Sequence, residues 1–211
     1  MRVIDCAQYS REWFDARLGI PTASNFKRIL TPGGKLSKQA DAYICELLAE
    51  KMGAPTIAGP VTPAMMNGTA NEDGARKMYE HMFDRDITQV GFVTTDDGRM
   101  GGSPDGIIDM EYGLEIKCPE GKTHVEWSLD GVLPDEHAPQ VHGYMIVTGL
   151  RRWHFMSYVP IKKRDGTYSF EHCLKPLVLT VDWNEYTDKL ALALESFWTR
   201  YQELADRLAK V

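Results

Sequence analysis

The stretch between Gly101 and Pro119 places the strongest constraint on the fold. It begins Gly-Gly-Ser-Pro-Asp-Gly, continues through a short apolar segment and a turn at Glu111-Tyr112-Gly113, and ends Leu-Glu-Ile-Lys-Cys-Pro. Successive side chains of a strand alternate between its faces, so Glu115 and Lys117 project from one face, and the apolar side chains from the other (Leu114, Ile116, Cys118). The pattern therefore predicts a hairpin whose second strand carries an acid and a base on one face.

Asp105 lies just before the first strand of this hairpin. An antiparallel turn near Tyr112-Gly113 is expected to fold its carboxylate back beside Glu115, so that two carboxylates and the Lys117 ammonium share one small region. Carboxylates held that close repel unless a cation sits between them, and hard oxygen ligands suit Mg²⁺ or Mn²⁺. The alternative is a surface turn with scattered charges, because Asp-Gly turns and Glu-x-Lys pairs are common.

The order of Asp105 and then Glu115-Ile116-Lys117 resembles the core signature of the PD-(D/E)xK nucleases, which cut phosphodiesters with one or two metal ions. The flanking residues narrow the match: from Trp13 to about Pro160 the chain resembles the YqaJ-like viral recombinase family, which includes the exonuclease of phage lambda. The resemblance implies an α/β restriction-endonuclease-like fold, with a mixed central sheet flanked by helices. It also makes the backbone carbonyl of Ile116 a metal ligand beside Asp105 and Glu115.

The N-terminal region offers a site for an anion. A helix is expected from Ser10 to Leu18, and a second short helix through Ile29-Leu30, capped by Thr22 or Ser24. The free N–H groups of a helix start favour an anion, and Arg17 is placed to add a bidentate contact. On the residues alone, a solvated helix is the alternative.

The same family pattern covers these residues, as Trp13, Arg17-Leu18-Gly19 and Thr22-Ala23-Ser24. The resemblance implies that Arg17 and Ser24 contact the 5′-terminal phosphate of DNA. Ser103, within Gly-Gly-Ser-Pro-Asp, is also assigned to DNA binding.

Two further residues are assigned by resemblance. The resemblance implies that Glu72, in Gly68-x-x-x-Glu72, is a third carboxylate at the metal site, directly or through water. Taken alone, Glu72 is an ordinary exposed helix glutamate. Gln140, in Ala-x-Gln140-Val141, implies a side chain that positions the active-site groups and substrate, although alone it is a surface residue near a helix start. His142 departs from the pattern, because relatives commonly carry a second glutamine there.

Periodicity and capping signals predict the other elements. Helices are expected at 37–53, 62–83, 122–129 and 138–148, and from a capping box begun by Asp182 to Leu208; strands are expected at 87–95, 151–159 and 177–181. Met78 and Met82 are expected to be buried, Thr62 to be an N-cap, and Lys162-Lys163-Arg164 to form an exposed turn placed to touch phosphate. The apolar stripe of the last helix packs on the body or on a neighbouring subunit, and both alternatives remain open.

Length and composition set the remaining bounds. A chain of 211 residues with 43% hydrophobic content is long enough for one substantial core. We expect one domain over 1–211, with N-terminal helices at 10–53, a catalytic core at 62–160 and a C-terminal strand and helix at 168–210. The net charge of −6 argues against non-specific coating of DNA, but a nuclease with basic residues lining one cleft is compatible with it.

Cysteine spacing and hydropathy point to an intracellular protein. The four cysteines form no Cys-x-x-Cys pair, so no zinc or iron–sulfur site is indicated, and reduced thiols fit a cytoplasm. No apolar run approaches the ~20 residues of a membrane span, and the start lacks a signal-peptide core. The expected location is the cytoplasm of a bacterial host, with no membrane partner, for a phage or prophage protein.

The resemblance implies a Mg²⁺-dependent 5′→3′ exonuclease, with Mn²⁺ as a substitute. It would degrade the 5′-ended strand of linear double-stranded DNA to mononucleotides, as a homotrimeric ring, and pass the 3′ strand to a single-strand annealing protein. Lys117 would position or deprotonate the attacking water, or stabilise charge; acting as a base requires a lowered pKa, so the electrostatic role is favoured. A structure-specific endonuclease and a non-catalytic DNA-end binding module are the alternatives.

Overall fold

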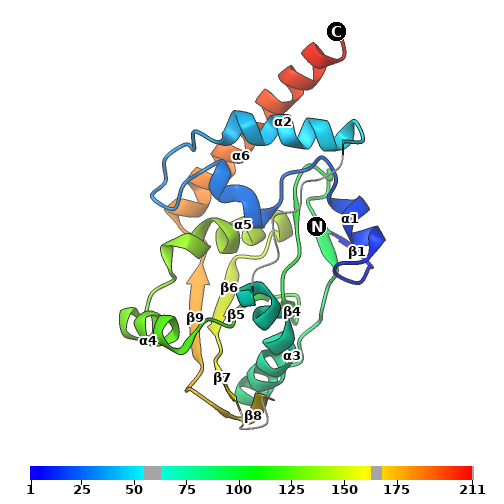
Figure 1. The fold of residues 1–211 in the computed structure, drawn as a ribbon. Coiled ribbons are helices and arrows are strands. Elements are labelled where there is room, and N and C mark those ends of the chain that lie inside the picture. The colour runs from blue at the N-terminus through cyan, green and yellow to red at the C-terminus, as the bar shows by residue number, and fades with distance from the viewer. Residues whose placement is uncertain (55–62, 163–167, 211) are drawn as a thin grey trace.

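A mixed four-stranded sheet forms the centre of the molecule (Figure 1). It is seen in a computed structural model that describes residues 1–54, 63–162 and 168–210, with side-chain surroundings left out at 63–70, 162 and 168–172. Its strand order is β4 (Gly106–Ile108), β5 (Tyr112–Lys117), β6 (Arg152–Ser157) and β9 (Leu177–Asp182). Strands β5 and β6 are parallel, whereas β4 and β9 run antiparallel to their neighbours. The expected α/β fold with a mixed central sheet is confirmed.

Helices cover both faces of this sheet. Those on one face belong to the crossover that the parallel strands β5 and β6 need between them. The crossover contains α4 (Gly121–Asp130), the 3₁₀ turn η2 (Asp135–His137) and α5 (Ala138–Thr148). Helix α5 packs on the face that carries the buried rings of Trp153 and Phe155, so these aromatic residues are core residues. Helix α3 (Pro63–Phe83) covers the opposite face, where Ala75 and Tyr79 pack against β5 and β6.

A second, three-stranded sheet lies beside the N-terminal helices. It consists of β1 (Arg2–Ile4), β2 (Phe92–Thr94) and β3 (Gly101–Gly102), all antiparallel. The helices near it are α1 (Arg11–Arg17), the 3₁₀ helix η1 (Ala23–Arg28) and α2 (Ala40–Lys51). A separate hairpin of β7 (Pro160–Lys162) and β8 (Tyr168–Cys173) lies at the opposite end of the molecule from α2 in Figure 1.

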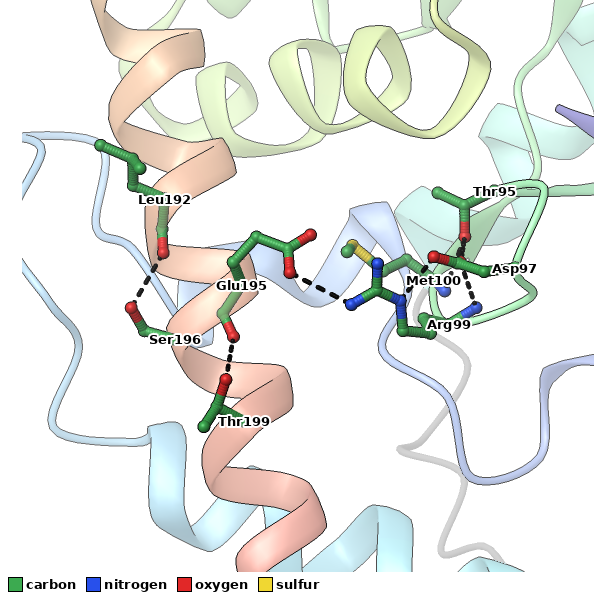
Figure 2. Close-up of polar contacts among 8 residues, drawn as sticks. All are labelled: Thr95, Asp97, Arg99, Met100, Leu192, Glu195, Ser196 and Thr199. Carbon is green, nitrogen blue, oxygen red and sulfur yellow. Dashed lines mark hydrogen bonds and ion pairs between the residues drawn. The ribbon is translucent and has the colours of Figure 1, made fainter.

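The C-terminal helix α6 (Glu185–Leu208) packs on the body of the chain. Four side chains of its predicted stripe enter the main core: Leu190, Leu194, Phe197 and Tyr201. Its outer surface is tied to the β2–β3 turn by Arg99, which binds Asp97 within the turn and reaches Glu195 at 3.1 Å (Figure 2). The choice left open for the stripe is thus settled for most of its length, although Leu208 at its end is 42% exposed.

Several predicted boundaries were wrong. The central hairpin turns at Asp109 and Met110, which both have positive φ, and not at Glu111-Tyr112-Gly113, because Tyr112 already pairs with Ile108. The strand expected over 87–95 is only Phe92–Thr94. The helix expected from residue 37 begins at Ala40.

Two capping predictions and one burial prediction also need correction. The N-cap of α6 is Asn184, which forms a capping box with Thr187, and not Asp182, which pairs within β9. The short helix after Thr22 is a 3₁₀ helix, and Thr22 makes no side-chain cap bond to it. Met82 is 43% exposed, since it lies on the outer side of α3.

Some expectations fall where nothing is described. The N-cap expected at Thr62 and the turn residues Lys163 and Arg164 lie outside the described residues, as does the side chain of Lys162. Within the described ranges, no helix is both long enough and apolar enough to span a membrane.

Candidate active site

The central hairpin brings Asp105 and Glu115 together. Strand β4 pairs Gly106 with Leu114, so the next position of the register sets Asp105 opposite Glu115. The Oδ2 atom of Asp105 accepts a hydrogen bond from the backbone N–H of Ile116 at 2.6 Å. This contact fixes the carboxylate at the end of β5, and it leaves the carbonyl oxygen of Ile116 on the same stretch of backbone.

Glu115 and Lys117 share one face of β5, as the alternation predicted. Glu115 is 1% exposed and forms an ion pair with the partly buried ammonium of Lys117. Leu114 and Ile116 lie on the other face, in the small core beneath α3. A carboxylate this deeply buried costs free energy unless it is paired, so the Lys117 ammonium compensates the charge of Glu115.

The charges of this cluster shift one another's pKa. Burial and the neighbouring charge of Glu115 raise the pKa of Asp105 to about 7. Burial also raises the pKa of Glu115, against the opposing effect of Lys117. Burial lowers the pKa of Lys117, but the charges of Glu115 and Asp105 outweigh it and the net shift is upward. The ammonium therefore stays protonated at neutral pH in this arrangement, which favours an electrostatic role over that of a base.

Glu72 lies at the border of the cluster, on α3. Its carboxylate is 3.8 Å from the guanidinium of Arg76. Burial and the charge of Asp105 raise its pKa, and its own charge acts on Glu115. The structure thus brings the third predicted carboxylate close enough to Asp105 and Glu115 for their charges to interact.

The donors at the end of β5 suit a hard cation. Asp105 and Glu115 disfavour each other's ionised form, and a divalent cation between them would remove that cost. Among the described residues, no group of three or more His, Cys, Asp or Glu side chains has the geometry of a metal site. The set present is two carboxylates and the carbonyl of Ile116, with Glu72 farther out.

Arg17 is held at the end of α1 on aromatic rings. Its guanidinium lies 4.0 Å from the ring centre of Trp13 and 5.5 Å from that of Phe92. Burial lowers its pKa, and among the described residues no carboxylate forms an ion pair with it. A half-buried cation without an ionic partner has the chemistry of an anion site.

Ser24 and Gln140 line one pocket of about 220 Å³, together with Lys27, Glu136, His137 and Pro139. Ser24 is exposed at the start of η1, with its Oγ 3.4 Å from that of Thr22. Burial, with smaller contributions from the charges of Lys117 and Lys27, lowers the pKa of His137 to about 3. His137 is thus neutral at ordinary pH and adds no positive charge to the pocket.

Ser103 is engaged inside the protein. Its Oγ accepts a hydrogen bond from the indole Nε1 of Trp13 at 2.8 Å, and its carbonyl accepts one from the hydroxyl of Tyr144 at 2.9 Å. Gln140 in turn donates from Nε2 to the Tyr144 hydroxyl at 3.0 Å. No sequence signal marks Tyr144 for this role, because a tyrosine on the buried side of a helix is typical of core packing.

Comparisons with known proteins identify the family and the fold. The sequence pattern of the YqaJ-like viral recombinase domain matches residues 12–151. The crystal structure of LHK-Exo in complex with dAMP is similar with a TM-score of 0.77 and 26% identity, over 95% of this chain and 97% of that one. None of the curated proteins matches the chain.

Two other crystal structures show the same fold. An alkaline exonuclease (LHK-Exo) from Laribacter hongkongensis has a TM-score of 0.71 and 26% identity, over 95% of this chain and 99% of that one. A phage-related exonuclease from Haemophilus somnus 129PT has a TM-score of 0.66, over 90% and 96% of the two chains, and its 12% identity supports the fold alone.

Proposed function

The chain belongs to the family of YqaJ-like viral recombinase domains, and from that membership and the geometry of its site we propose that it is a metal-dependent 5′→3′ exonuclease. Its substrate would be the 5′-ended strand of linear double-stranded DNA, and its product mononucleotides. The observation that carries the proposal is the presence of two sites: an acid–base cluster of Asp105, Glu115 and Lys117, and an Arg17 guanidinium that has no ion-pair partner among the described residues.

In this proposal Asp105, Glu115 and the carbonyl of Ile116 hold Mg²⁺, or Mn²⁺ in its place, and Glu72 contributes directly or through water. The bound metal would supply Lewis-acid stabilisation of the charge on the scissile phosphate and lower the pKa of the attacking water. Lys117 keeps its proton and orients that water, while its charge offsets the negative charge that builds up on the phosphate. Its pairing with Glu115 fixes the ammonium in place.

Arg17 and Ser24 would hold the 5′-terminal phosphate in this mechanism. The guanidinium offers a bidentate contact to phosphate, and stacking on Trp13 restricts its motion before the substrate arrives. Gln140 would position the substrate between this anion site and the metal, since it lines the pocket that also contains Ser24. The arrangement favours an enzyme that starts from a DNA end over an endonuclease.

Partners are also part of the proposal. A homotrimeric ring around the duplex would explain how a chain with a net charge of −6 stays on DNA, because enclosure replaces a strong electrostatic grip. The 3′ strand would pass to a single-strand annealing protein, in the cytoplasm of a bacterial host. Mass measurement of the protein on DNA tests the ring, and monomers alone would contradict it.

Digestion of a linear duplex with Mg²⁺ tests the activity. The comparison is between a 5′-phosphate and a 5′-hydroxyl end, for the wild type and for Lys117→Ala. We expect mononucleotides from the phosphorylated end and their loss in the variant. Cutting of a closed circle at a similar rate would support the endonuclease, and binding of DNA ends without product under any metal would support the non-catalytic module.

A further inference from the structure

A side-chain hydrogen bond and a short stretch of backbone connect the anion site to the carboxylate cluster. It begins at Trp13, whose ring lies against the Arg17 guanidinium and whose Nε1 donates to Ser103 Oγ at 2.8 Å. Ser103 is separated from Asp105 only by the buried residue Pro104. Asp105 is itself held at 2.6 Å by the backbone N–H of Ile116. The segment Ser103-Pro104-Asp105 therefore links helix α1, which carries Arg17, to the first predicted metal ligand.

The segment that carries Ser103 is clamped from both sides. The backbone N–H of Gly101 donates to the carbonyl of Pro21 at 3.1 Å, in the loop before η1. On the other side Tyr144 donates to the Ser103 carbonyl at 2.9 Å. Gly102 lies so close to Tyr144 that an added Cβ would come within 2.6 Å of its Cε1 atom. A segment held this tightly transmits a small displacement instead of absorbing it.

The electrostatics point the same way. Burial raises the pKa of Tyr144 far above that of free tyrosine, with further contributions from the charges of Glu115 and Asp105. Its hydroxyl thus keeps its proton and donates to Ser103 in the presence of both carboxylates. The positive charge of Arg17 lowers the pKa of Tyr144, so the two side chains lie within electrostatic range. The ring of Trp13 belongs to the anion site, and its N–H, with Ser103 and Tyr144, connects that site to the carboxylates.

We propose that the Trp13–Ser103 hydrogen bond couples the binding of a terminal phosphate at Arg17 to the placement of Asp105 for catalysis. Trp13, Ser103 and Tyr144 are then positioning residues, and Ser103 does not contact DNA. A phosphate on Arg17 fixes the guanidinium and the indole stacked against it, and the indole N–H fixes the Ser103–Asp105 segment. The inference rests on the proposed function and goes beyond it: the 5′-phosphate raises the rate of the chemical step as well as the affinity for the end.

Steady-state kinetics on duplexes with a 5′-phosphate or a 5′-hydroxyl end test the coupling. Trp13→Phe keeps a ring against Arg17 and removes the N–H, while Ser103→Ala removes the acceptor. We expect each variant to lower the kcat ratio of phosphate to hydroxyl ends by about tenfold, the size of a typical coupling between sites, with KM for the phosphorylated end unchanged. The double variant should be no worse than either single one, because both remove the same bond. Ser103→Thr keeps the hydroxyl and should keep most of the ratio.

A second readout does not depend on turnover. Affinity for a 5′-phosphorylated duplex end, measured by fluorescence anisotropy with EDTA present, should be unchanged in Trp13→Phe and Ser103→Ala and reduced in Arg17→Ala. Trp183→Phe is the matched control, since it also removes an indole N–H hydrogen bond, the one donated to Asp188 at 2.7 Å between β9 and α6. It should match the wild type in both assays.

The possible failures are distinct. An equal loss of kcat on both kinds of end in Trp13→Phe and Ser103→Ala would show a merely structural role and overturn the coupling alone. An unchanged kcat ratio in both variants, with the phosphate preference still lost in Arg17→Ala, would do the same. A wild type that cuts both ends equally well would overturn the end recognition of the proposed function, and the coupling with it.

Discussion

Two aspartates on neighbouring parts of the chain have opposite electrostatic environments. Asp97, in the β2–β3 turn, receives hydrogen bonds from Thr95 and Arg99 (Figure 2). Slight burial raises its pKa, but these hydrogen bonds outweigh that effect and lower the pKa to about 2. Asp105 is partly buried beside Glu115, and desolvation together with the charge of Glu115 raises its pKa to about 7. The first carboxylate is fully compensated by protein groups, whereas the second is under-compensated. The difference separates a charge that stabilises the fold from one arranged for a ligand.

The cations follow the same division. The Arg99 guanidinium binds Asp97 and Glu195, and the hydrogen bond that it donates to Asp97 raises its pKa. Arg17 is stacked on Trp13 without an ion-pair partner among the described residues, and burial lowers its pKa. An anion bound at Arg17 would compensate its positive charge, as Asp97 and Glu195 compensate that of Arg99. A divalent cation would in the same way compensate the negative charge of Asp105. In the proposed function, a phosphate would supply the missing charge at Arg17 and a metal ion the missing charge at Asp105.

The largest expected effect comes from making the same substitution at both aspartates. Asp105→Asn keeps an oxygen for the Ile116 N–H but removes the charge that would hold the metal, so we expect exonuclease activity to fall by about 10³-fold, at the upper end for loss of a transition-state-stabilising group. Asp97→Asn should stay within about twofold of wild type, because surface groups away from such features have small effects. Initial rates of mononucleotide release measure both. Similar losses in the two variants would erase the distinction between the two aspartates.

Stability should change in the opposite sense. A raised carboxylate pKa means that the folded state disfavours ionised Asp105, a cost that appears above the ordinary value of 3.8 and is complete above about 7. Asp105→Asn should therefore stabilise the metal-free protein, by about 1–3 kcal/mol at pH 8 and by progressively less as the pH falls towards 4. Urea unfolding in EDTA at both pH values measures this. A variant less stable than wild type at pH 8 would mean that Lys117 already compensates both carboxylates.

The close approach of the charges was predictable, but its geometry was only partly so. Alternation along β5 fixed which face carries Glu115 and Lys117, because a slip of one residue would bury the charges in the core beneath α3. The turn was misplaced because Gly113 was taken as the turn glycine, whereas the turn uses the non-glycine residues Asp109 and Met110 at positive φ. A turn centred at Tyr112-Gly113 would have carried Asp105 past the end of β5.

The roles of Gly113 and Ser103 depend on residues far away in the sequence. Gly113 is needed because the ring of Trp153 lies where its Cβ would be, 2.2 Å from Cη2. Ser103 reads as a loop hydroxyl available to DNA, yet its partners Trp13 and Tyr144 come from helices on either side of it in the sequence. Local patterns report faces and caps, whereas a hydrogen bond between such separate elements is fixed only by their packing.

The smallest effect is expected where charges are compensated at the surface. The lowered pKa of Asp97 contributes stability that is present above pH 3.8 and lost as the pH falls towards 2, but its side chain is 43% exposed and solvent screens the pair. Asp97→Asn should therefore lower the free energy of unfolding at pH 7 by about 0.2–1 kcal/mol, and 1 M NaCl should reduce the difference further. Chemical denaturation at both salt concentrations measures it, with Glu195→Gln as the partner variant on α6. A salt-insensitive loss of more than about 2 kcal/mol would show that this turn contributes far more to the fold than a solvent-screened pair does.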